Sequence, residues 1–314
     1  MKNPVIAFAD VTASDDPSVL HSGTFGTSHW HIDSDNTLHI GKGTFASLSN
    51  SQSAPPWTQY GDEIVKVIID GPVVLGANNR ELFGYLGFTS IEGLDKVDAS
   101  HAENLEFAFF GAQAPDLDLH TWDVRNVTDS SFMFQQATSK IINLTGWKLP
   151  KLKFASWMFC LETQVEELDL SGFNFRNVSS DATLHTLMYT THLHVLRLGP
   201  DSLLEKTQLR VGVQAKDDLQ YANYWQNVGN GSIEHPNGEN IYSSSELMDN
   251  FKGEAPYVYV RPRIKAARSQ ITIKYQDESG KSLAPNDFFT GNVGDSYTTA
   301  PKDISGYTLD TDKL

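Results

Sequence analysis

The sequence predicts an α/β protein built as a leucine-rich-repeat-type solenoid with a period of about 25 residues. We expect an N-terminal β-hairpin cap before the solenoid and a small β-rich, β-grasp-like module after it. Three observations lead to this prediction: leucines at near-constant spacing, aromatic residues at fixed distances from those leucines, and strand-like alternation at both ends of the chain.

The leucines form the most regular pattern in the sequence. They recur at nearly equal steps, of which the last is the longest: Leu94, Leu119, Leu144, Leu170 and Leu198. A period of about 20–29 residues is typical of leucine-rich repeats, in which every copy contributes one short strand. The strand of each copy is therefore expected at or just before its leucine.

Other positions keep their distance from the leucines while their residue type changes. WDVRNVTDSSFMF begins at Trp122, WKLPKLKFASWMF begins at Trp147, and Phe173 occupies the same slot in the next copy. We expect each coil to contain a short strand, a turn and a short helical segment. No coil can bury its apolar face alone, so stacking requires apolar residues at fixed positions without requiring identical ones. These aromatics are thus expected in the core rather than in a sugar-stacking ladder.

Residues 29–40 (HWHIDSDNTLHI) alternate as two antiparallel strands would. Placing the apolar residues on one face pairs Trp30 with Ile40 and Ile32 with Leu38. This register leaves a three-residue loop that ends at Asn36, a residue type that tolerates the left-handed conformation such loops require.

The remaining chain divides by composition into further segments. YSSSELMDNFKG predicts a short helix with Ser243 and Glu246 as a capping box and Gly253 after its end. The predicted organisation is a flexible segment (1–27), an N-terminal β cap (28–62), the leucine-rich solenoid (63–200), a C-terminal cap (201–260), a basic linker (261–269) and a partial β module (270–314). Residues 1–9 are interpreted as the remnant of an export signal or as an added sequence.

Composition excludes several classes of function. The chain has 314 residues, a net charge of -15 and a pI near 5.0, so it has no positive field to attract a nucleic acid or an anionic membrane. No apolar run reaches the roughly 18 residues of a membrane span, so we expect no direct membrane insertion. Acidity of this size favours a soluble monomer.

The residue types used in catalysis or metal binding occur without the patterns that such chemistry requires. His29, His31 and His39 share one strand face, but no nearby carboxylate or cysteine completes a zinc site, so we expect no metal and no cofactor. Cys160 is expected to be a buried hydrophobic residue. The carboxylate pairs lie on strand faces or in turns, so we expect no catalytic residues.

One surface has a geometric argument in its favour, namely the outward face of the repeated strands. Residues that alternate with the buried leucines should point outward in three columns. The first column is Asp118, Asn143, Asp169 and Arg197, the second is Asp116, Ile141, Glu167 and Val195, and the third is His120, Thr145 and Ser171. From these we select as ligand-binding candidates Asp116, Asp118, His120, Asn143, Thr145, Glu167, Asp169 and Arg197. An ordinary solvated face remains the alternative.

Several stretches together carry a family resemblance. VIIDGPVV, LFGYLGFTSIEGLDKVDASHAENLEFAFFG and LDLHTWDVRNVTDSSFMF resemble the BspA-like leucine-rich repeat surface proteins of bacteria. ITIKYQDESGKSLAPNDFFTGNVGDSYTTAPKDISGYTL resembles the opening of a mucin-binding-protein (MucBP) module. The copies here depart from the consensus, since Ala102 and Ala108 replace larger residues.

The resemblance implies an extracellular protein attached to the cell wall. It implies a non-enzymatic adhesin that binds host mucin or an extracellular-matrix glycoprotein or glycan. Two other hypotheses stay open: a structural spacer or stalk that presents a distal adhesive domain, and a hydrolase that acts on the wall or on glycans.

Overall fold

The computed structural model describes residues 18–49, 54–161, 164–178, 185–205, 207–209, 221–263, 268–292 and 302–308. It divides into two compact units, Met1–Pro262 and Arg263–Leu314, each of which is described by itself. The expected signal remnant at residues 1–9 lies outside the described residues, as does the part of the expected linker at 264–267.

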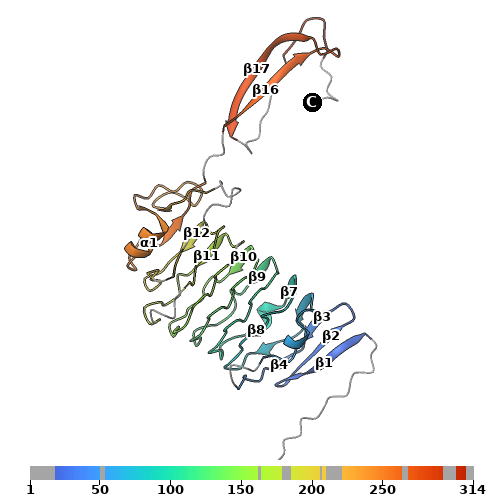
Figure 1. Cartoon of the computed structure of the whole chain (residues 1–314), viewed down its shortest axis with the longest axis vertical. Coiled ribbons are helices and arrows are strands. Elements are labelled where there is room, and N and C mark those ends of the chain that lie inside the picture. The colour runs from blue at the N-terminus through green and yellow to red at the C-terminus, as the bar shows by residue number, and fades with distance from the viewer. Residues whose placement is uncertain are drawn as a thin grey trace, which may run out of the picture. The chain divides into compact units, whose positions relative to one another are not determined.

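A five-stranded sheet opens the first unit and leads into the solenoid (Figure 1). Its strands, in spatial order, are β1 (Val19–Phe25), β2 (Ser28–Asp33), β3 (Thr37–Ile40), β5 (Lys66–Ile69) and β7 (Ser90–Glu92). The predicted hairpin is confirmed, since Trp30 pairs with Ile40 and Ile32 with Leu38. Asn36 has the expected left-handed conformation, with a φ of 58°.

Strand β1 is a finding that the sequence analysis missed. It lies within the segment 1–27 that was expected to be flexible, and it pairs antiparallel with β2. Its sequence, VLHSGTF, is rich in small and polar residues and shows little alternation, so only its partner strand reveals it. It covers the edge that β2 would otherwise expose.

The middle of the unit is a β-solenoid of about five turns with little helix. Its strands β9 (Asp116–Asp118), β10 (Ile141–Asn143), β11 (Glu167–Asp169) and β12 (Val195–Arg197) are each very short. Ile141 pairs with Asp116 of the preceding coil, and Val195 pairs with Glu167 in the same way, both in parallel register. A second ladder of still shorter strands runs along the N-terminal coils: β4 (Gly43–Thr44), β6 (Val73–Val74) and β8 (Val97–Asp98).

The predicted helical segment of each coil is wrong, and with it the α/β class. In the described residues, α1 (Ser244–Asn250) is the single α-helix, and two 3-10 turns accompany it, η1 (Thr58–Tyr60) and η2 (Leu94–Lys96). Where a helix was expected, backbone amides bond to the next coil instead. Phe107 N donates to Ser131 O at 3.0 Å, and Phe109 N to Met133 O at 2.8 Å. A helix would use these amides within its own segment, so this turn and a helix exclude each other.

The leucine ladder is buried, and the neighbouring coils are tied together at the leucines. Leu119 and Leu144 directly follow β9 and β10, whereas Leu94 lies in η2 rather than in a strand. The indole Nε1 of Trp122 donates to Leu94 O at 2.9 Å, and that of Trp147 to Leu119 O at 2.8 Å. Each tryptophan therefore joins its own coil to the preceding one by a buried hydrogen bond.

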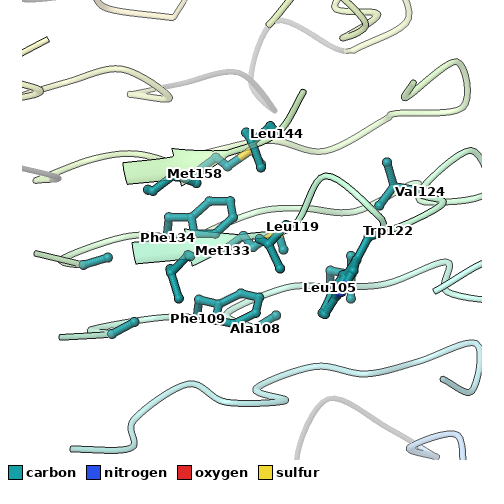
Figure 2. Close-up of a cluster of buried hydrophobic side chains, with 14 of the residues drawn as sticks. Leu105, Ala108, Phe109, Leu119, Trp122, Val124, Met133, Phe134, Leu144 and Met158 are labelled. Carbon is teal, nitrogen blue, oxygen red and sulfur yellow. The ribbon is translucent and has the colours of Figure 1, made fainter. Parts of the chain in front are cut away.

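The interiors of successive coils merge into one continuous core, of which Figure 2 shows the middle. The rings of Phe109, Phe134 and Phe159 stack coil upon coil, with centroid distances of 5.7 and 5.4 Å. Trp122, Trp147 and Phe173 are all buried, which confirms their expected place in the core and excludes them as a sugar-stacking ladder.

Antiparallel strands and a short helix cover the C-terminal end of the solenoid. β12 pairs with β15 (Val258–Val260), followed in the sheet by β13 (Trp225–Asn227) and β14 (Ile241–Tyr242). Helix α1 has the predicted capping box, in which Ser243 accepts from the amide of Glu246. Gly253 follows the helix with a φ of 86°.

Arg261, which the sequence analysis assigned to a basic linker, is buried in this end region. Its Nε donates to Ala222 O at 2.8 Å, and its Nη1 lies 3.2 Å from Thr191 O and from Leu193 O. One guanidinium thus satisfies carbonyl groups from two distant chain segments that would otherwise be buried without this donor.

The second unit consists of a long hairpin and a short segment beside it. β16 (Arg268–Gln276) pairs antiparallel with β17 (Ser282–Asn292), and the bond from Asp277 N to Lys281 O closes the turn at 277–281 between them. Across the described parts of both units, no helix has the length and apolar character needed to span a membrane.

We predict that Phe134→Ala lowers the free energy of unfolding by about 3–5 kcal/mol, because it leaves a cavity between two stacked rings. Phe154→Ala is the control, since the Phe154 side chain is exposed, and it should cost less than about 1 kcal/mol. Urea unfolding monitored by circular dichroism measures both. Equal losses for the two variants would contradict the stacked core.

We also predict that Arg261→Met lowers the free energy of unfolding by about 2–4 kcal/mol, because carbonyl groups of two segments lose a buried hydrogen-bond donor. Arg125→Met is the matched control: Arg125 is paired with Asp123, but it lies on the surface, and its loss should cost about 0.5 kcal/mol. Thermal unfolding of both variants gives the comparison. An unchanged midpoint of thermal unfolding for Arg261→Met would show that the hydrogen bonds of Arg261 are not needed for stability.

Candidate ligand-binding face of the solenoid

The outward face of strands β9–β11 is hollowed. A depression of about 560 Å³ lies over these strands, and a neighbouring one of about 300 Å³ adjoins it toward η2. The residues of the larger depression include Asp116, Asp118, Asn143, Thr145, Glu167 and Asp169. His120 borders the smaller one. Arg197 lies beside them, with its guanidinium 3.7 Å from the Glu167 carboxylate.

The first column forms as the sequence register predicts. Asp118 pairs with Asn143, and Asp169 with Arg197, in parallel strands. Asn143 Nδ2 donates to Asp118 Oδ1 at 2.7 Å, and His120 Nδ1 lies 2.7 Å from the same oxygen. The hydrogen bond from His120 is the main cause that lowers the pKa of Asp118, and the Asn143 amide adds to it.

These column residues also have a structural task. The side-chain oxygens of Asp118, Asn143 and Asp169 each accept the backbone amide two residues later, at 3.4, 3.1 and 2.9 Å. Such Asx turns end the strand and direct the chain into the next side of the coil. The polar character of this column is thus explained in part without a ligand.

Asx turns also occur at two other corners of the coil. At one corner the accepting residues are Asn78, Asn104 and Asp129. At the other they are Asp98, Asp123 and Asn174. Asx turns are therefore a property of the coil. The strand-face residues that cap no turn are chiefly Asp116, Thr145 and Glu167, and of these Glu167 is paired with Arg197.

The second column is only partly as expected. Ile141 is 54% exposed between Asp116 and Glu167, and gives this acidic face an apolar spot. Val195, expected to point outward in the same column, is fully buried. It lies opposite Val260 of β15 at the end of the solenoid that the C-terminal segments cover, so the open face ends before β12.

Carboxylates dominate the electrostatics of the face. The larger depression is lined by five acidic residues and by one cation, Lys140. Their summed field attracts cationic groups and repels anionic ones, and the carboxylate oxygens can accept hydrogen bonds from neutral hydroxyl groups. A ligand rich in sulfate or in sugar carboxylates is therefore a poor match for this surface.

A partly exposed aromatic stripe on another side of the coils was not identified from the sequence. The rings of Phe107, Phe132, Trp157 and His185 stack in sequence, with centroid distances of 4.5, 6.4 and 4.2 Å. The signal was present, because Phe107, Phe132 and Trp157 each lie two residues before a core phenylalanine. The close pairs Phe107–Phe132 and Trp157–His185 each cover one face of their rings, so much of the flat surface that sugars require is already occupied.

The histidines of the N-terminal sheet differ from the expectation in one respect. His39 lies between two carboxylates, at 3.4 Å from Asp33 and 3.2 Å from Asp70, so acidic neighbours are present after all. Its ring stacks on that of His31 at 4.6 Å. Among the residues that the structure describes, no group of three or more ligating side chains could hold a metal ion.

Cys160 is buried, as the sequence analysis expected. Burial raises the pKa of its thiol to about 11, and the hydrogen bond with the Leu161 backbone does not offset that rise. The thiolate that nucleophilic chemistry requires is therefore scarce at neutral pH.

Two family comparisons match separate parts of the chain. Residues 79–191 match the family described as "Mycoplasma protein of unknown function, DUF285", and residues 270–314 match the MucBP domain. No solved structure matches the chain.

Curated relatives match over short stretches. Internalin J of Listeria monocytogenes serotype 4b (strain F2365) is 46% identical over 55 residues, which are 18% of this chain and 6% of that protein. Internalin I of Listeria monocytogenes serovar 1/2a (strain ATCC BAA-679 / EGD-e) is 26% identical over 152 residues, 46% of this chain and 8% of that protein. The chain thus spans less than a tenth of these relatives.

We predict that the charge on Asp33 stabilises the N-terminal sheet when the pH is above the pKa of this carboxyl, and that the stabilisation is lost when the pH is well below it. Burial raises the pKa of Asp33, but hydrogen bonds from the Thr37 and Asp35 amides and from His39 lower it by more, so the net shift is downward. A lowered pKa contributes stability that is present above the unfolded value of 3.8 and is lost as pH falls through the folded value.

The test is Asp33→Asn, which keeps a side-chain acceptor and removes the charge. Urea unfolding at pH 7 should show a deficit of about 1 kcal/mol relative to the wild type. The deficit should shrink toward zero as the pH falls through the lowered pKa of Asp33. A deficit that is equally large at pH 7 and at acid pH would show that the charge is not its cause.

Proposed function

We propose that this chain, which joins a DUF285-type repeat region to a MucBP domain, is part of a bacterial surface adhesin. It binds host mucus or extracellular-matrix glycoproteins, and the strand face of the solenoid supplies one contact surface. The observation that carries the proposal is the MucBP match at 270–314 beside a solenoid with a hollowed polar face. The similarity to the two internalins supports the same class of surface protein.

The contacts on the strand face are weak individually. Asp116, Thr145 and Glu167 present acceptors and one hydroxyl around the exposed Ile141 side chain. Each solvent-exposed hydrogen bond contributes about 1 kcal/mol or less. Useful adhesion therefore requires many copies on one cell surface, where multivalency raises the effective affinity.

Charge selects among the candidate ligands. The chain has a net charge of -15, and the strand face is acidic as well. Neutral glycans and cationic protein segments fit this face better than sialylated or sulfated chains, which it repels. The proposed partner is thus a neutral glycan or the protein part of a matrix glycoprotein.

The proposal includes location and mode of action. The protein acts outside the cell, attached to the wall, as a monomer and without catalysis or cofactor. The strand-face carboxylates support the absence of catalysis, because Asp118 and Asp169 cap turns and are held by backbone amides. A hydrolase would instead need two carboxyls free to converge on one bond.

A spacer that presents a distal adhesive domain is the second candidate. The observation in its favour is that Asx turns account for most of the polar first column. A stalk requires a regular stacked solenoid and no recognition face at all.

We predict that the chain binds immobilised gastric mucin or matrix glycoproteins, and that Asp116→Ala/Glu167→Ala reduces this binding about tenfold, through the loss of two polar contacts. The matched control is Asp62→Ala/Glu103→Ala, which removes two exposed acids away from the strand face and should bind as the wild type does. Surface plasmon resonance measures all three proteins.

The outcomes separate the hypotheses. No binding by the wild-type chain to any of these surfaces supports the spacer. Equal binding by both double variants and the wild type removes the strand face from the proposal. Release of sugar or peptide products from mucin or peptidoglycan during incubation identifies a hydrolase.

A further inference from the structure

One coil of the solenoid departs from the Asx pattern at the two further corners described above. In neighbouring coils an aspartate or asparagine stands at each of these corners and accepts a backbone amide. In the coil at 147–154 the first slot holds Lys148, the equivalent of Asp123. The second slot holds Phe154, which pairs with Asp129 of the preceding coil. Neither a lysine nor a phenylalanine side chain can accept an amide.

The fold permits these exchanges without requiring them. Pro150 stands two residues after Lys148 and has no amide for an Asx residue to cap, so the first corner does not need an aspartate. The Phe154 side chain is 48% exposed, so the core does not need an aromatic ring at the second corner. Residues that break a local rule without a packing reason are typical of functional surfaces.

Three lysines lie along the side of the coil that joins these two corners. Lys148, Lys151 and Lys153 are all exposed, whereas Leu149 and Leu152 between them are buried. The lysine side chains therefore point outward from one short segment, and the exposed Phe154 ring follows directly after them. We refer to the three lysines and Phe154 as the basic patch.

The charges of the basic patch are not neutralised by neighbouring carboxylates. Lys151 Nζ donates to Oδ1 of Asn126 in the preceding coil at 2.7 Å, and this acceptor is a neutral amide. Among the residues that the structure describes, none of the three lysines forms an ion pair. By contrast, Arg125 of the preceding coil and Arg176 of the following one are each paired with an aspartate. The patch therefore presents three positive charges to solvent.

The charge of the whole chain limits the kind of anion that the basic patch can hold. A net charge of -15 repels a long polyanion, which would also run along acidic surfaces. A short anionic segment interacts mainly with the nearest charges, because screening limits the range of exposed charges to about 8 Å at physiological ionic strength. Lysine ammonium groups hold carboxylates as point charges, with little demand on geometry. The exposed Phe154 ring offers an apolar contact beside them.

We propose that the basic patch is a docking surface for a short acidic peptide segment of a partner protein. Carboxylates of the segment pair with the three lysines, and one aliphatic or aromatic side chain of the segment packs on the Phe154 ring. The patch lies between the two further corners of the coil and not on the strand face, and it prefers the opposite charge. The inference thus goes beyond the proposed function and does not depend on it.

The experiment uses the full chain and a dye-labelled peptide of aspartates and glutamates around one central leucine. Fluorescence anisotropy should show binding of this acidic peptide, and the binding should weaken as sodium chloride is added, because salt screens exposed ion pairs. The control probe replaces the aspartates and glutamates by asparagines and glutamines, and it should not bind.

Variants of the patch separate its two kinds of contact. The patch variant Lys148→Gln/Lys151→Gln/Lys153→Gln should weaken binding of the acidic peptide about tenfold, through the loss of three exposed ion pairs. Phe154→Ala should weaken it about threefold, through the loss of the apolar contact.

A matched control removes the same charge elsewhere. The variant Lys42→Gln/Lys252→Gln/Lys281→Gln replaces three exposed lysines that lie outside the patch. It changes the net charge of the chain as much as the patch variant does, so it should bind the acidic peptide only slightly less well than the wild type.

Several outcomes would overturn the inference. Equal binding by the patch variant and the control variant would do so, as would equal binding of the acidic and the neutral peptide, or no binding of the acidic peptide. Tighter binding of heparin than of the acidic peptide would replace the peptide by a sulfated polymer as the partner. The strand-face variant Asp116→Ala/Glu167→Ala should bind the acidic peptide at least as well as the wild type, so the two surfaces are tested separately.

Discussion

The solenoid depends on backbone hydrogen bonds between coils. Phe107 N, Phe109 N and Phe132 N all donate to carbonyl groups of the coil that follows. Each coil therefore needs the carbonyl groups of the next coil as acceptors. A single coil would expose these groups to water and bury no core, so it has no stability of its own. The ladder fixes the position of every turn along the stack. Residue identity is left free wherever the side chain points outward and is restricted to apolar types wherever it points in.

That constraint also governs the aromatic residues. Trp122 and Trp147 bring an indole N–H into the core, and each finds its acceptor in the preceding coil. Phe107, Phe132 and Trp157 adopt positive φ at equivalent places, a conformation that bulky residues rarely take. Inter-coil bonds from their amides hold Phe107 and Phe132 in this conformation, and the three rings stack along the solenoid. The stripe follows from the turn geometry and needs no ligand to explain it.

The turns of the coil use many of the polar side chains on its surface. On the strand face, Asp118 and Asn143 cap their own turns, so the residues beside them present the freer groups. Acidic residues outnumber cations in the lining of the larger strand-face depression, so it has no net positive charge to bind an anion. In the coil at 147–154, Lys148 and Phe154 stand in slots that hold turn-capping residues elsewhere, so this coil presents cations where the strand face presents acids.

The sequence by itself determined that the coils repeat, the hairpin register around Asn36, the capping box at Ser243 and the first polar column, because each follows from local alternation, turn chemistry or repetition. The tertiary structure decided what those patterns could not express. It replaced the expected helical segments by turns, since amides such as Phe107 N find their acceptors in the next coil and not within their own segment. It buried Val195 and Arg261 beneath or beside strands distant in sequence, and it brought Asp70 to His39. Periodicity records which residues face inward; only the packed chain determines which distant segment covers them.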